Sequence, residues 1–251
     1  MKPSFLKYEK PLLTCMLQAD TPDRIQELFQ KASSNGAEAY GLQFCRLKPE
    51  FRTKDIYRSL FSLADAAPTY VTNYRIGENV NKTDDALAAE LLEFAACGAA
   101  LCDIMGDYYD PQPGELSMDS IAISKQQNLI EQVHRAGASV LMSSHVGKPL
   151  SAEQVLTIAL EHQRRGADIS KIVLPANTME EQLEHLRITH LLKQTLRIPF
   201  LFLSGGSFCY LQRRVGAYLG NCMTLCVYEY DDFATKLQPL LSDMKTLREL
   251  L

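Results

Sequence analysis

The sequence has little excess charge, no paired cysteine motif and no long hydrophobic run. Its 26 Lys and Arg residues face 30 Asp and Glu residues, a formal net charge of −4. This balance gives no reason to expect nucleic acid or a membrane surface as a partner. No apolar run approaches the roughly 18 residues of a membrane-spanning helix. With 46% hydrophobic and 22% charged residues, the composition is that of an ordinary globular protein.

The seven cysteines lack the spacing of a disulfide framework. Their number is odd, no C-x-x-C pair occurs, and Cys15, Cys102 and Cys222 lie in apolar runs. This pattern indicates free thiols in a reducing compartment, so we expect a cytoplasmic protein. Free cysteine is among the most buried residue types, and we interpret these residues as small core side chains.

A junction between a helix-like and a strand-like segment is repeated along the chain. The junctions read NGAEAYGLQF from Asn35, CGAALCDIM from Cys97, AGASVLMSS from Ala136 and RGADISKIV from Arg165. Each Gly-Ala pair follows a stretch with helical spacing of apolar residues and precedes an apolar run. Glycine adopts the left-handed conformation that ends many helices without steric penalty, which explains its place at the junctions.

Eight short apolar runs predict eight strands. They span residues 12–17, 38–44, 69–73, 100–104, 139–143, 171–174, 200–203 and 223–228, each followed by a helix-like segment. Apolar strands that alternate with helices are typical of a parallel sheet covered by helices. Eight such units predict an α/β fold, a (β/α)8 TIM barrel formed as a single domain by residues 1–251. A doubly wound open sheet is the alternative, but its usual G-x-G-x-x-G motif after the first strand is absent.

Two residues at the ends of predicted strands stand out as candidates for chemistry. Lys171 lies in an otherwise apolar strand, and a desolvated lysine amine is a nucleophile toward carbonyl groups. His145 follows the neighbouring strand and could exchange protons near neutral pH. Other interpretations stay open at this point. Lys171 could point outward to the helical layer or pair with an acid such as Glu161, and His145 could be a loop histidine bonded to backbone.

Further polar residues cluster at the same predicted end of the barrel, where active sites of this fold gather. They are Gln43, Asn73, Arg75, Glu78, Asp103, Asp107, Ser204, Arg213, Glu229, Asp231 and Asp232. Arg213 and its neighbour Arg214 could also belong to a solvated helix face. The acids are scattered, and no H-x-H or H-E-x-x-H motif occurs, so we expect no metal site.

Three segments resemble type I 3-dehydroquinate dehydratases of the shikimate pathway. ASVLMSSHVGKPLS is similar to the family's fifth strand, which ends in Ser-x-His. GADISKIVLPAN is similar to the sixth strand, whose lysine forms a Schiff base. PFLFLSGGSFCYLQRRVGAYLGNCMTLCVY resembles the stretch from the seventh to the eighth strand. The resemblance runs from about Leu12 to the C-terminus.

The resemblance implies roles for individual residues. Lys171 matches the imine-forming lysine, His145 the general acid and base, and Arg213 the arginine that binds the substrate carboxylate. Arg75 matches the arginine after the third strand with a shift of one residue, and Glu78 falls near the glutamate that orients the histidine. Gln43 and Ser204 are expected to line the substrate pocket. The implied reaction is a cofactor-free carbon–oxygen lyase reaction that converts 3-dehydroquinate to 3-dehydroshikimate, on the route to the aromatic amino acids.

The sequence also departs from the family pattern. Gly41 and Gln43 stand where the family has Glu and Arg, Gly205 replaces a methionine, and Asp232 and Lys236 replace a serine and a glutamine of the last loop. Three hypotheses follow. The protein dehydrates 3-dehydroquinate or a related cyclic ketoacid, it is a Schiff-base lyase or aldolase for another small carbonyl compound, or it is a non-catalytic relative. The resemblance also implies a homodimer.

Overall fold

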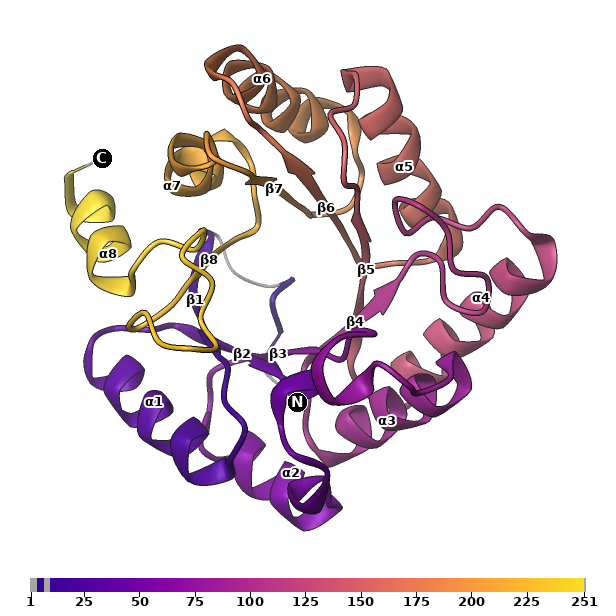
Figure 1. The fold of residues 1–251 in the computed structure, drawn as a ribbon, viewed down its shortest axis with the longest axis vertical. Helices are drawn as coiled ribbons and strands as arrows, with labels where there is room; N and C mark the ends of the chain where they lie inside the picture. Colours follow the sequence, from indigo (N-terminus) through magenta and orange to yellow (C-terminus); the bar gives the residue numbers. More distant parts are fainter. Residues whose placement is uncertain (1–3, 7–9, 251) are drawn as a thin grey trace.

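The computed structural model describes residues 4–6 and 10–250, and eight parallel strands form its centre (Figure 1). The strands are β1 (Leu12–Leu17), β2 (Ala39–Gln43), β3 (Thr69–Thr72), β4 (Leu101–Met105), β5 (Ser139–His145), β6 (Ile169–Pro175), β7 (Phe200–Gly205) and β8 (Met223–Cys226). The α-helices are α1 (Pro22–Ser34), α2 (Lys54–Ser62), α3 (Asp84–Cys97), α4 (Ser120–Arg135), α5 (Ala152–Arg165), α6 (Met179–Thr195), α7 (Tyr210–Leu219) and α8 (Leu241–Leu250). Short 3₁₀ turns span Phe44–Arg46, Pro49–Phe51 and Gly77–Asn79.

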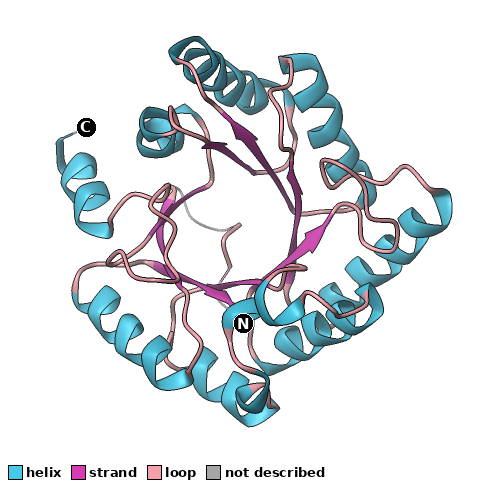
Figure 2. Cartoon of the chain, viewed as in Figure 1, coloured by secondary structure: helices cyan, strands magenta, loops and turns pink. Residues whose placement is uncertain are grey.

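The strands follow one another around a barrel in the order β7-β6-β5-β4-β3-β2-β1-β8. Figure 2 shows the helices as a ring outside the strands, which is the predicted (β/α)8 barrel. At the seam between β7 and β8, the Asn221 side chain accepts the Phe202 N–H at 2.8 Å and donates to the Phe202 carbonyl at 2.8 Å. The Cys222 N–H also donates to the Phe200 carbonyl, so the seam is closed by a side chain and one backbone bond. The expected fold is therefore confirmed.

The helices begin and end at the capping residues and glycines that the sequence indicates. Thr21 and Ser151 cap α1 and α5, and Ser151 forms a reciprocal capping box with Gln154. At the end of α5, Gly166 has a φ of +100°, the left-handed conformation expected at this junction. The chain then turns directly into β6, which places Lys171 inside the barrel wall.

Two layers of buried side chains hold the barrel together. Inside the barrel, the lower layer is apolar and consists of Phe5, Leu12, Ala39, Leu101, Leu141, Ile169, Leu201 and Met223. Between strands and helices, the larger layer includes the stacked rings of Phe44 and Phe94, whose centroids lie 4.3 Å apart. The lower layer forms an apolar floor. Leu101 and Ile169 precede Asp103 and Lys171 by two residues on β4 and β6, so these two polar side chains point inward above the floor.

Strands β5 and β6 extend beyond their predicted ends. β5 continues to His145, and β6 starts at Ile169 and continues to Pro175. Backbone pairing joins His145 to Val173 and Leu174 to Ser204, so polar residues are included in the ladder. The predicted boundaries followed apolar runs alone, and a ladder does not end where the side chains become polar.

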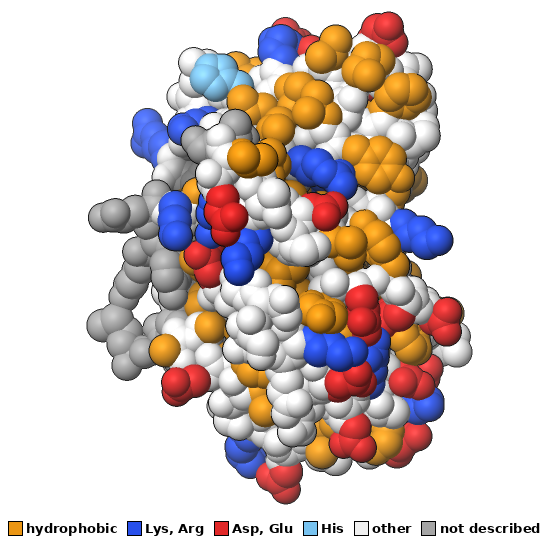
Figure 3. Space-filling model, turned by 90° about the vertical axis from the view of Figure 1, so that its left-hand side faces the viewer, with side chains coloured by type: hydrophobic (Ala, Val, Ile, Leu, Met, Phe, Trp, Pro, Cys, Tyr) orange, Lys and Arg blue, Asp and Glu red, His pale blue; other side chains and the backbone are white. Residues whose placement is uncertain are grey.

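None of the seven cysteines forms a disulfide within the described residues, as expected. Cys15 and Cys102 are fully buried, as the sequence indicated, whereas Cys97 and Cys222 are only partly buried and are not core side chains. Within the ranges the structure describes, none of the helices is long and apolar enough to span a bilayer. Figure 3 shows acidic and basic side chains interspersed with hydrophobic ones on one face of the molecule, in keeping with the small net charge.

Candidate active site

A cavity of about 500 Å³ opens above the apolar floor at the carboxyl ends of the strands. It is lined by Met16, Gln43, Tyr70, Thr72, Tyr74, His145, Lys171, Val173, Leu203, Arg213, Leu225, Thr235 and Gln238. This is the end of a TIM barrel at which active sites are built. The cavity brings together four residues expected from the sequence: Lys171, His145, Arg213 and Gln43.

Lys171 is the third residue of β6 and points into the barrel, where only 4% of its surface is exposed. Its Nζ forms an ion pair with Asp103 on β4, at 3.2 Å from Oδ2. The outward orientation considered above does not occur. Glu161 is not its partner, because that carboxylate pairs with Arg164 and Arg165.

Asp103 organises a buried hydrogen-bonded group around the lysine. Its Oδ2 accepts hydrogen bonds from the hydroxyls of Tyr70 and Tyr74, and its Oδ1 accepts one from Ser143 Oγ at 2.6 Å. Burial alone would raise the pKa of Asp103, but the Lys171 charge and these donors outweigh it and lower the pKa. Asp103 is therefore a carboxylate, and Lys171 has a buried counter-ion that the sequence did not predict.

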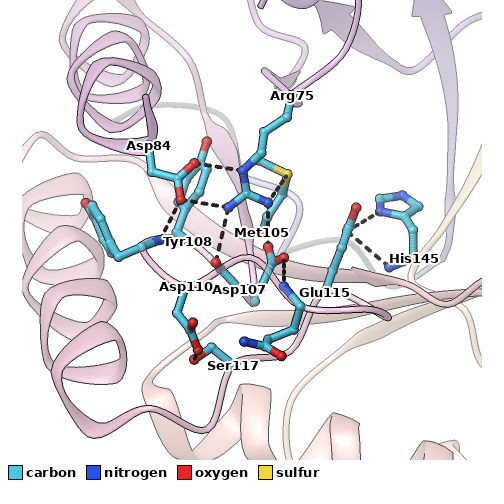
Figure 4. Close-up of polar contacts among 12 residues, drawn as sticks. Arg75, Asp84, Met105, Asp107, Tyr108, Asp110, Glu115, Ser117 and His145 are labelled. Atoms are coloured by element: carbon cyan, nitrogen blue, oxygen red, sulfur yellow. Dashed lines mark hydrogen bonds and ion pairs between the residues drawn. The ribbon is translucent and has the colours of Figure 1, made fainter. Parts of the chain in front are cut away.

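His145 is the last residue of β5 and lies in the same cavity. Its Nδ1 is 2.6 Å from Glu115 Oε2, and the same oxygen accepts the His145 backbone N–H at 3.1 Å (Figure 4). A carboxylate can only accept hydrogen bonds, so Nδ1 carries the hydrogen, and in the neutral ring Nε2 has the free lone pair. The histidine is thus oriented and can act as a base.

Glu115 has the orienting position that the sequence assigned to Glu78, and that assignment is wrong. Glu78 is exposed in the 3₁₀ turn Gly77–Asn79 after β3 and is not among the lining residues of the cavity. Glu115 comes instead from the loop between β4 and α4. Its φ of +52° lies in the left-handed region, which costs a non-glycine residue about 1 kcal/mol.

Arg75 does not reach the cavity, so its expected place at the substrate is also wrong. Its guanidinium pairs with Asp84 Oδ1 at 2.7 Å and with Asp107 Oδ1 at 2.8 Å, and it donates to the Asp107 carbonyl (Figure 4). The Tyr109 N–H donates to the same Asp84 side chain. Arg75 is therefore a clamp that joins α3 to the loop carrying Glu115.

Removal of the Arg75 clamp is expected to destabilise the protein by about 3 kcal/mol, because Arg75→Met leaves Asp84 and Asp107 without their cation. Denaturant unfolding measures the change. The matched control is Arg58→Met, which breaks an exposed ion pair with Asp55 and should cost less than about 0.5 kcal/mol. Equal costs for the two variants would contradict the clamp.

Arg213 lies on α7 and lines the cavity as expected. Its Nε donates to the Ser204 carbonyl at 2.6 Å, and within the described residues no carboxylate lies at ion-pair distance from it. Burial lowers the pKa of Arg213 to about 10, because the cation is poorly solvated. An anionic ligand in the cavity would relieve this cost.

Ser204 serves the site through its backbone and not through its hydroxyl. Leu203 faces the cavity, so the next side chain along β7 points to the opposite face of the strand. There the Ser204 hydroxyl lies 2.7 Å from His185 Nδ1 on α6. The expected contact of its side chain with a ligand is wrong, and its role is to hold Arg213.

The β2 wall of the cavity is neutral. Gln43 lines it as expected, and its amide donates to Cys45 Sγ at 3.3 Å. At Gly41 the space for a side chain is filled by Met16 from β1, since a Cβ would lie 2.1 Å from the Met16 sulfur. Thr72 adds a buried hydroxyl that has no hydrogen-bond partner in the described part of the chain.

Two polar residues reach the cavity from the segment after β8, but not those expected. Thr235 and Gln238 line it, whereas Asp232 and Lys236 are exposed and absent from its lining. The segment is fastened to α1, because Asp231 accepts from Arg24 at 3.0 Å and also accepts the N–H groups of Phe233 and Ala234. Asp232 and Lys236, which the resemblance matched to pocket residues of the family, therefore do not face the cavity.

Comparisons with known proteins agree with the fold and point to one family. The family model for type I 3-dehydroquinase matches residues 54–251. A 3-dehydroquinate dehydratase of Alkaliphilus oremlandii (strain OhILAs) is 31% identical over 100 residues, a match that spans 39% of this chain and only 39% of that relative. Among solved structures, 3-dehydroquinate dehydratase from Geobacillus kaustophilus HTA426 has a TM-score of 0.83 at 15% identity, covering 98% of this chain and 93% of that one. A type I enzyme from Clostridium difficile with covalently modified comenic acid has a TM-score of 0.79 at 14% identity, covering 98% and 94%.

Proposed function

The chain belongs to the type I 3-dehydroquinase family, and on that premise we propose that it dehydrates 3-dehydroquinate or a related cyclic ketoacid through a Schiff base on Lys171. The observation that carries the proposal is that a buried amine and an oriented imidazole lie in one cavity. The Lys171 amine and the Glu115-oriented His145 face the same space. The guanidinium of Arg213, which has no carboxylate partner among the described residues, also lines it.

The chemistry follows from these positions. Lys171 attacks the C3 ketone and forms an iminium, which withdraws electrons and acidifies the C2 hydrogen. His145 Nε2 removes that proton and then returns it to the C1 hydroxyl, which leaves as water. Hydrolysis of the imine releases 3-dehydroshikimate and restores the lysine. The iminium formed from the Lys171 amine is the electron sink, so this scheme uses no external cofactor.

The direct test is incubation with 3-dehydroquinate. Turnover gives a conjugated enone that is followed by ultraviolet absorbance, and borohydride reduction of the mixture leaves a stable adduct on Lys171 that peptide mass spectrometry locates. An adduct on another lysine, or neither product nor adduct, would refute the proposal.

Arg213 is proposed to bind the substrate carboxylate. Arg213→Gln is expected to raise KM about 100-fold, because a charged hydrogen-bonded contact is lost. Steady-state kinetics measure the effect. Arg214→Gln is the matched control, since its neighbouring guanidinium instead pairs with Asp243 on the surface. Equal KM values for the two variants would argue against this role.

A second candidate is a Schiff-base lyase for a different carbonyl compound. It is favoured by the neutral β2 wall, where Met16 fills the space above Gly41 and Gln43 supplies an amide and no charge. Borohydride trapping with a panel of ketoacids that differ in ring hydroxyls separates the candidates. Adducts with other ketoacids, and none with 3-dehydroquinate, would select the second.

The proposal extends to the binding partners, the cell compartment and the oligomeric state of the protein. A small-molecule carboxylate is the proposed partner, and we expect neither nucleic acid nor membrane as a partner. The cytoplasm is the proposed compartment because the cysteines form no disulfide within the described residues. The proposed homodimer is tested by sedimentation at several protein concentrations.

A further inference from the structure

The Lys171 amine is surrounded by a group of side chains that the dehydration scheme leaves unused. Tyr74 follows β3, and its hydroxyl is hydrogen-bonded both to Lys171 Nζ and to Asp103 Oδ2, the latter at 2.5 Å. Its ring stands edge-on to His145, with 5.0 Å between ring centroids. Tyr74 thus contacts the nucleophile, its counter-ion and the neighbouring base.

The direction of each hydrogen bond is fixed by chemistry. Asp103 accepts only, so the Tyr74 hydroxyl donates to it, and the Tyr74 oxygen is then free to accept from the Lys171 ammonium. Burial and the nearby Asp103 charge raise the pKa of Tyr74 well above its ordinary value, so the phenol keeps its hydrogen. The hydroxyl therefore joins lysine to carboxylate as an unbroken donor–acceptor chain.

Lys171 must lose a proton before it can attack a carbonyl. We propose that Tyr74 is a further catalytic residue, which passes the Lys171 proton to Asp103 before attack and returns it to the departing hydroxyl of the carbinolamine. The inference rests on the proposed function, since it takes Lys171 as the imine-forming amine.

The protons balance over the two steps. First, the Tyr74 oxygen takes one proton from the ammonium while its own hydrogen moves to Asp103, which leaves a neutral amine and a neutral acid. The amine adds to the carbonyl carbon, and its excess proton moves to the carbonyl oxygen, which gives the carbinolamine. Tyr74 then donates to that hydroxyl and is reprotonated by Asp103, so the C–O bond breaks, water leaves, and the iminium and the carboxylate result.

Tyr74 fits this role better than its neighbours. Tyr70 also contacts Lys171 Nζ, at 3.1 Å, and lines the cavity, but none of its surface is exposed, whereas Tyr74 is partly exposed. His145 has its Nδ1 engaged by Glu115, and its Nε2 is required for the C2 proton. The site therefore divides imine formation and proton abstraction between two sets of residues.

The experiment uses formaldehyde as the carbonyl, so it does not depend on the identity of the substrate. The folded protein is treated with formaldehyde and excess cyanoborohydride, which makes imine formation limit the rate, and methylation of each lysine is followed by peptide mass spectrometry. Exposed Lys193 is the internal standard. Tyr74→Phe is expected to slow methylation of Lys171 about 100-fold relative to Lys193, the lower range for loss of a general acid.

Two further tyrosine variants serve as controls. Tyr70→Phe should have a clearly smaller effect than Tyr74→Phe. Tyr108→Phe should have none, because it removes a buried hydroxyl that has no partner among the described residues. An unchanged Lys171 rate in Tyr74→Phe, an equal fall in Tyr70→Phe, or no methylation of Lys171 in the unsubstituted protein would each overturn the inference.

Turnover of 3-dehydroquinate by the unsubstituted protein is measured in parallel. A selective effect of Tyr74→Phe without turnover leaves the inference standing and removes the proposed substrate. Turnover with no effect of Tyr74→Phe on Lys171 removes the inference and leaves the proposed function standing.

Discussion

Replacement of Lys171 by methionine is expected to eliminate both the borohydride-trapped adduct and measurable turnover, because the amine is the group that becomes the iminium. Methionine keeps most of the volume of the side chain, so the barrel should still close. Peptide mass spectrometry after reduction and the enone absorbance measure the two losses. Lys193→Met is the control and should retain both. An adduct of unchanged yield in Lys171→Met would show that another lysine carries the chemistry.

The same substitution is expected to destabilise the protein near neutral pH by about 3 kcal/mol, since Asp103 loses the cation that compensates its burial. With Lys171 present, the pKa of Asp103 lies below its ordinary value of 3.8. Without the Lys171 charge, only the hydrogen bonds from Ser143, Tyr70 and Tyr74 oppose the effect of burial, and we expect the pKa to rise above 3.8. A raised folded pKa means that the native state binds more protons, so stability falls as pH rises above 3.8. The difference from the unsubstituted protein should therefore grow from acid to neutral pH.

A second substitution separates the charge effect from a packing defect. Asp103→Asn in the Lys171→Met background removes the uncompensated charge and should recover most of the lost stability near neutral pH. Denaturant unfolding of the single and double variants over a pH series measures this. Equal stability of the two variants at every pH would assign the loss to packing.

The barrel could be predicted from the sequence because its signals are local. The Gly-Ala junctions, the cap residues such as Ser151 and the short apolar runs each depend on a few neighbouring residues, and all agree with one fold. Once the strands were predicted, the residues at their ends could be predicted to lie close together, because Lys171 and His145 belong to adjacent paired strands. Their meeting in one cavity needed only the alternation of side chains along β5 and β6.

The partners of these residues could not be predicted in the same way. Asp103 and Glu115 meet Lys171 and His145 across 68 and 30 positions of the chain, and Glu115 does so from a loop with a left-handed residue. Asp103 was one acid among several at strand ends, and its inward direction alone distinguishes it. Arg75 and Glu78 were misplaced because a family pattern after β3 was followed where this chain forms a clamp and a 3₁₀ turn.

Glu115→Gln is expected to lower kcat about 1000-fold with little change in KM, because an amide neither fixes the Nδ1–H form of His145 nor stabilises the imidazolium. Imine formation uses other residues and should continue. The borohydride adduct should then carry the intact substrate, heavier by one water than the dehydrated form, as mass spectrometry can measure. Glu78→Gln is the matched control and should behave as the unsubstituted enzyme. A loss of kcat in Glu78→Gln alone would restore the pairing that the family pattern implied.

The backbone conformation of Glu115 allows a second, independent test of this prediction. Its φ of +52° is strained for glutamate and unstrained for glycine, so Glu115→Gly removes the carboxylate while it relieves the turn. The loop keeps its other anchors, namely the Arg75 clamp and the hydrogen bond from Ser144 Oγ to the carbonyl of residue 115 at 2.7 Å. Glu115→Gly should therefore lose kcat as Glu115→Gln does, with unfolding stability no lower than that of Glu115→Ala. The Glu115 carboxylate therefore orients His145 from a strained backbone position.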